Sequence, residues 1–91
     1  MNFLQALANY RRRKRLERRR DEATYAVQTI RAFLEGTGGA HEWDDFTSCS
    51  LRDPELNRIR KLARAVELPA GREERATLET LAQQAERLAS R

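Results

Sequence analysis

The chain has 91 residues, a formal net charge of +4 and 35% charged residues, which is typical of one small domain with solvated faces and a modest core. Its single cysteine and single histidine exclude a disulfide framework and the paired ligands of a zinc site. No run approaches the ~20 apolar residues of a membrane span, and the first charges follow the N-terminal apolar stretch instead of preceding it as in a secretory signal. We therefore expect a cytoplasmic protein without metal or cofactor.

The first expected element is a long helix over residues 3–34, since no glycine or proline interrupts this stretch and Gly36 follows it. Projected at about 100° per residue, its apolar side chains form two stripes on nearly opposite sides. One stripe suits a core, whereas the other needs a second copy of the chain, a partner, a lipid surface, or a break in the helix. The core stripe contains Leu16, Ala23, Ala26, Val27, Ile30, Phe33 and Leu34, and the second stripe contains Phe3, Leu4, Leu7 and Tyr10.

A basic block occupies residues 11–20 of this helix. Eight cations and one anion give it a net charge of +7, so the other 81 residues sum to −3. Such a segment attracts phosphate backbones, anionic lipid or acidic protein surfaces. Its cations point in every direction around the helix axis, which argues against the reading of a base sequence. The predicted anion-binding residues are Arg11, Arg12, Arg13, Lys14, Arg15, Arg18, Arg19 and Arg20.

Residues 36–52 are predicted to form a glycine-rich and aromatic loop. We expect Trp43 and Phe46 to fold back and close the core, because a lone tryptophan in so small a domain is usually buried. His41 and Cys49 lie in the same segment, but no third residue is available to orient them as a nucleophilic pair. We also hypothesise that its acidic residues pair with the basic block, in the same chain or in a second copy, and mask it. These residues are Glu42, Asp44 and Asp45.

Two further helices are predicted at the C-terminus. Asp53 can cap the first of them and Pro54 suits its first position, while Pro69 is expected to end it. The second is expected over residues 72–90, and the short connection between the two favours an antiparallel hairpin. The expected core positions are Leu56, Ile59, Ala63 and Val66 in the first helix and Leu78, Leu81, Ala85 and Leu88 in the second.

The predicted fold is therefore all-α with three helices. A long N-terminal helix packs on a C-terminal antiparallel hairpin, and a glycine and aromatic loop separates the two. Residues 1–20 form a basic amphipathic extension of the first helix, and residues 21–91 form the three-helix domain.

For function, we expect a small non-enzymatic binding or adaptor protein, with no catalytic residues and no small-molecule substrate. The first candidate partner of the basic block is nucleic acid, especially structured RNA, recognised by backbone charge and shape. One alternative is a protein-only role, in which the first helix forms a homo-oligomer or docks on an acidic protein. Another is an anionic membrane surface, with Phe3, Leu4 and Leu7 inserted and the arginines at the headgroups.

Overall fold

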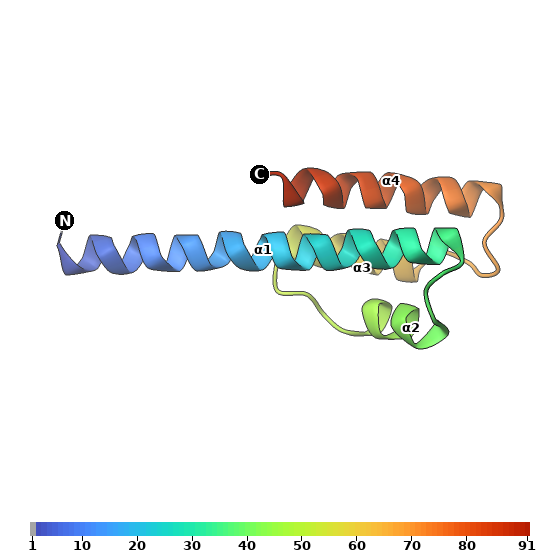
Figure 1. Cartoon of the computed structure of the whole chain (residues 1–91), viewed down its shortest axis with the longest axis horizontal. Helices are drawn as coiled ribbons and strands as arrows, with labels where there is room; N and C mark the ends of the chain where they lie inside the picture. The colour runs from blue at the N-terminus through green and yellow to red at the C-terminus, as the bar shows by residue number, and fades with distance from the viewer. Residues whose placement is uncertain (1) are drawn as a thin grey trace.

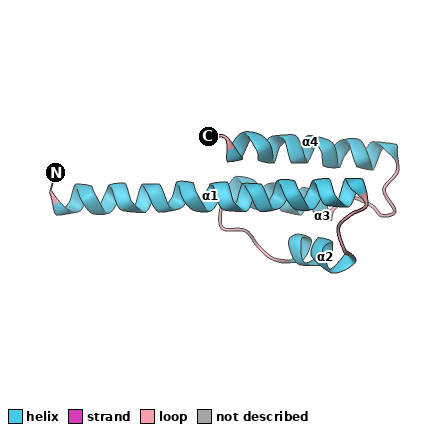
Figure 2. Cartoon of the chain, in the orientation of Figure 1, coloured by secondary structure: helices cyan, strands magenta, loops and turns pink. Residues whose placement is uncertain are grey.

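The computed structural model describes residues 2–91, which contain four helices and no strand. They are α1 (Phe3–Glu35), α2 (Ala40–Ser48), α3 (Pro54–Arg64) and α4 (Arg72–Ala89). Figure 1 shows α1 running the length of the molecule, with α4 antiparallel beside its C-terminal half and α2 and α3 against the same half. Figure 2 shows the connections between them. The all-α class is confirmed, and the prediction of three helices is wrong.

The long first helix is present and has a defined signal at each end. Asn2 and Gln5 form a capping box, in which Gln5 N–H donates to Asn2 Oδ1 over 2.8 Å and Asn2 N–H donates to Gln5 Oε1 over 3.4 Å. Gly36 ends the helix in the left-handed conformation, with φ of 75°, which glycine adopts without strain. The helix is therefore continuous over 33 residues and is not broken between its two apolar stripes.

The core is formed by the C-terminal half of α1 and the apolar faces of the other three helices. The α1–α4 contact is the most extensive of the helix pairs, and it contains the fully buried alanines Ala23, Ala26, Ala82 and Ala85. Small side chains let two helix backbones approach closely, which accounts for the extent of the contact between these antiparallel helices. Arg31 adds ion pairs across it, because its guanidinium donates to the carboxylates of Glu79 and Glu86 on α4.

Helix α2 replaces the loop that the sequence predicted at residues 40–48. Trp43 and Phe46 lie three residues apart, so a helical turn puts both rings on one face, and both are buried. Trp43 stacks on Phe33 of α1 with ring centroids 4.3 Å apart, and Phe46 meets the edge of Tyr25 at 5.6 Å. The prediction that Trp43 and Phe46 fold back and close the core is confirmed, although they do so from a helix and not from a loop.

Helix α3 begins where predicted and ends earlier. Leu56 N–H donates to the Asp53 carboxylate over 3.1 Å, and Pro54 takes the first helical position. The helix ends at Arg64, so Pro69 lies in the connection to α4 and does not end it. The buried Arg60 side chain holds α2 to α3, because it donates to Thr47 O over 2.6 Å and to Asn57 Oδ1 over 2.9 Å.

Candidate functional site

The N-terminal half of α1 extends beyond the packed body. Figure 1 shows that α3 and α4 stop near the middle of α1 and leave its N-terminal half without a neighbour. From residue 3 to residue 17 every side chain is exposed except that of Leu7, which is half-buried, and Phe3 and Leu4 are 77% and 73% exposed. At 1.5 Å per residue, this extension is about 22 Å long. Within residues 2–91, the second apolar stripe therefore packs against no other helix.

Five of the eight cations in the basic block have no hydrogen bond or ion pair with the described residues. The other three have partners: Lys14 lies 3.6 Å from Glu17 and over the Tyr10 ring, Arg19 bonds to Asp53, and Arg20 donates to the main-chain oxygen of Arg91. The cations without such a partner are Arg11, Arg12, Arg13, Arg15 and Arg18.

The start of α3 is fixed to α1 where the extension leaves the body. Both carboxylate oxygens of Glu22 accept main-chain hydrogen bonds, from Arg52 N–H over 2.7 Å and from Asp53 N–H over 2.8 Å. Arg19 Nε donates to Asp53 Oδ1 over 2.8 Å. This hydrogen bond, followed by the charge of the carboxylate, raises the pKa of Arg19, so the guanidinium stays charged. Two acidic side chains thus position the segment that carries Arg52.

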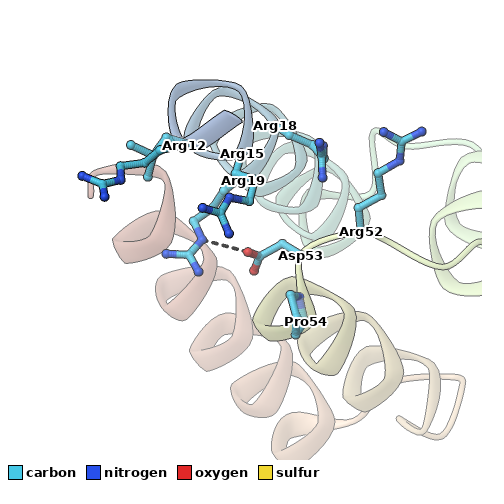
Figure 3. A pocket seen from close by; sticks show the side chains of 8 residues that line it. Arg12, Arg15, Arg18, Arg19, Arg52, Asp53 and Pro54 are labelled. Carbon is cyan, nitrogen blue, oxygen red and sulfur yellow. Dashed lines mark hydrogen bonds and ion pairs between the residues drawn. The ribbon is translucent and has the colours of Figure 1, made fainter. Parts of the chain in front are cut away.

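A cleft of about 360 Å³ lies between α1 and this segment. In Figure 3 Arg15 and Arg19 lie beside the Asp53 carboxylate, whereas Arg12 points away on one side and Arg18 and Arg52 stand on the other. Asp53 does not offer a free negative charge there, because Arg19 and Leu56 N–H occupy its two oxygens and its side chain is only 10% exposed. The lining residues are Arg12, Arg15, Leu16, Arg18, Arg19, Arg52, Asp53 and Pro54.

The cleft lies on the side of α1 that, nearer the C-terminal end of the helix, faces the core. On a helical projection, positions 12, 15, 16 and 19 fall on the same side as the buried Ala23, Ala26 and Ile30. Where the body ends, that side changes from small apolar residues to mostly arginine. The cations surround the helix as the sequence indicates, but the fold places those on one side next to a further arginine, Arg52. Sequence reasoning missed Arg52, because only the contacts of Glu22 bring it to the block.

The acidic segment lies elsewhere. Glu42, Asp44 and Asp45 are exposed on α2, which packs beside the C-terminal half of α1. Within residues 2–91 the ion pairs of the block go to Glu17 and Asp53. The hypothesis that these three residues mask the block in the same chain is therefore wrong for this structure.

Other kinds of site have little basis in the described part of the chain. Residues 2–91 contain no group of three or more histidine, cysteine or acidic side chains placed to hold a metal ion. None of their helices is long and apolar enough to cross a membrane. Comparison with protein families, with curated proteins and with solved structures gave no match. The basic extension and its cleft therefore form the candidate functional site of the described residues.

Proposed function

We propose that this protein binds nucleic acid through the phosphate backbone, using the basic extension of α1, with structured RNA as the first candidate ligand. The observation that carries the proposal is the set of five arginines with no partner among the described residues, on a helix clear of the body. Because these guanidiniums have no internal ion pair to give up, their charge is available to phosphates. The remaining residues are net negative, so attraction for a polyanion is concentrated on the extension.

The distribution of the cations favours a grooved polyanion over a flat one. A helix that lies on a flat bilayer meets it with one side only, whereas the block carries cations on every side. A groove in a folded nucleic acid has phosphates on both of its walls, so it can engage several sides of the helix at once. This contact reads charge and shape, and it needs no side chain aimed at a base edge.

The exposed tip of the extension supports a second candidate, an anionic membrane surface. Phe3 and Leu4 are largely exposed and Leu7 is half-buried, which gives a small apolar patch before the cations. Three such side chains provide only marginal anchoring without help from charge. Replacing Phe3 and Leu7 by serine separates the candidates, because vesicle binding should collapse while nucleic-acid binding should barely change.

The proposal is tested by fluorescence anisotropy with a labelled RNA hairpin and a DNA duplex, each at salt concentrations between about 50 and about 200 mM. The block variant carries R11Q, R12Q, R13Q and R15Q. The matched control carries K61Q, R64Q, R72Q and R87Q, which removes the same charge from exposed positions on the body.

We expect the block variant to lose affinity on the order of 100-fold, and its plot of log K against log salt to become shallower by about 3. The control should lose much less, because its charges lie away from the extension. Equal losses in the two variants, or wild-type binding that vanishes near physiological salt while an oligomer persists, would favour the protein-only role instead.

A further inference from the structure

We propose that the cleft between α1 and the start of α3 binds one phosphate of the nucleic-acid backbone, held by Arg12, Arg15 and Arg52. This inference rests on the proposed function and makes it specific. It states that the cations of the block are not equivalent. Those on the side of α1 that faces the cleft should contribute more per charge than those that face solvent.

Arginines from two elements of the fold line the same cleft, although their side chains point apart without a ligand. Arg12, Arg15 and Arg18 on α1 and Arg52 before α3 line one cleft, and none of their side chains has a hydrogen bond or ion pair with the described residues. A planar guanidinium offers two parallel N–H groups to a phosphate, so several of them around one cleft can surround its oxygens. The block alone, on a straight helix, directs its cations outward.

Asp53, the acidic residue that lines the cleft, already has partners for its charge. A carboxylate beside a phosphate is repulsive unless it is already neutralised. The charge of Asp53 is balanced by Arg19 at 2.8 Å, and its second oxygen caps α3 through Leu56 N–H. The cleft therefore keeps a net positive charge from its other arginines. Because Asp53 already caps α3, the N-terminus of α3 is not the group that binds the phosphate.

The main chain that carries Arg52 is held in place before any ligand binds. Arg52 lies in the connection between α2 and α3, but its main chain is fixed to α1 because Arg52 N–H and Asp53 N–H both donate to the Glu22 carboxylate. A side chain on a fixed backbone loses less conformational entropy on binding than one on a mobile loop. Arg52 should therefore contribute more to affinity than an exposed arginine of the body that has the same charge.

The size and place of the cleft indicate how much of the ligand it takes. Its volume of about 360 Å³ lies near the lower end of small-ligand pockets, so it admits a phosphate with part of its sugar and not a duplex. It lies where the extension meets the body. A nucleic-acid backbone that follows α1 from its N-terminal end reaches the cleft beside Asp53 and Pro54.

The test compares two double variants of the full chain in the anisotropy assay with the RNA hairpin. The cleft pair carries R12Q and R15Q, and the solvent pair carries R11Q and R13Q. Each pair removes two charges from the same helix, and all four arginines lack partners among the described residues. We expect about a tenfold greater loss of affinity for the cleft pair than for the solvent pair. Far-UV circular dichroism checks that helix content is the same in both.

A second comparison places R52Q beside R64Q, which removes an exposed arginine at the far end of α3. R52Q should weaken binding about tenfold and R64Q less than about twofold. If the cleft and solvent pairs lose equal affinity, or R52Q behaves like R64Q, the cleft inference is wrong and the proposed function stands. If neither pair weakens binding and the four-site block variant also binds normally, the proposed function itself fails.

Discussion

The two halves of α1 belong to one uninterrupted helix, yet different forces stabilise them. The C-terminal half has Ala23, Ala26 and Ile30 fully buried against the rest of the body. The N-terminal half buries almost nothing and carries like charges four residues apart, such as Arg11 and Arg15, which weaken a helix. The comparison shows that helical structure in this protein does not require burial along the whole of a helix.

Continuity explains how the extension stays helical. Starting a helix is costly, whereas adding a residue to an existing helix fixes only one more pair of backbone dihedrals. The packed half of α1 supplies the existing helix, and the capping box of Asn2 and Gln5 closes the free end. The extension can thus carry side chains that stabilise no core.

The largest effect should be a difference in stability between the packed body, which includes α2, and the exposed N-terminal half of α1. Phe46→Ala removes a fully buried ring that contacts Tyr25 and Trp43, so it should lower the free energy of unfolding by about 3–5 kcal/mol. Phe3→Ala removes a ring that is 77% exposed and should change it by less than about 0.5 kcal/mol. Urea unfolding followed by circular dichroism measures both. A large loss for Phe3→Ala would mean that the tip packs on something in solution.

An intermediate effect is expected at the boundary between the halves. Glu22→Gln keeps the shape of the side chain but replaces one accepting oxygen by an amide that cannot accept from Arg52 or Asp53 N–H. We expect a loss of about 1–2 kcal/mol in unfolding free energy and weaker RNA binding, because Arg52 is no longer held in place. As the control, Asp21→Gln removes the charge of an exposed neighbour and should leave stability nearly unchanged. Equal effects of the two substitutions would show that charge, and not the hydrogen bonds, is what matters at Glu22.

Local signals in the sequence were enough to predict part of this structure. The absence of glycine and proline from residues 3–34 predicted α1, and Gly36 marked its end. Asp53 and Pro54 marked the start of α3. Each of these features depends on residues close in sequence, so a single chain contains the information. The spacing of apolar residues in α4 likewise predicted its buried face, which includes Leu78, Leu81, Ala85 and Leu88.

The errors have physical causes of a different kind. Helix α2 has only nine residues, and its N-cap residue, Gly39, has no side chain to cap it, so neither periodicity nor capping marked this helix. Helix α3 ends at Arg64, before Pro69, with Ala65 at its C-cap, and alanine is not a residue that signals the end of a helix. The cleft was missed because Arg52 lies 30 residues from Glu22 in the sequence, and only the folded body brings them together. Long-range contacts of this kind leave no local pattern.

The most direct test of the basic extension as a nucleic-acid site is an amide chemical-shift titration of the isotope-labelled full chain with the RNA hairpin. The largest shifts should fall on residues 11–19 of α1 and on the segment 52–54, with little change in α2 or at the start of α4. Shifts centred on α2, or confined to residues 3–7, or absent near physiological salt, would contradict this account.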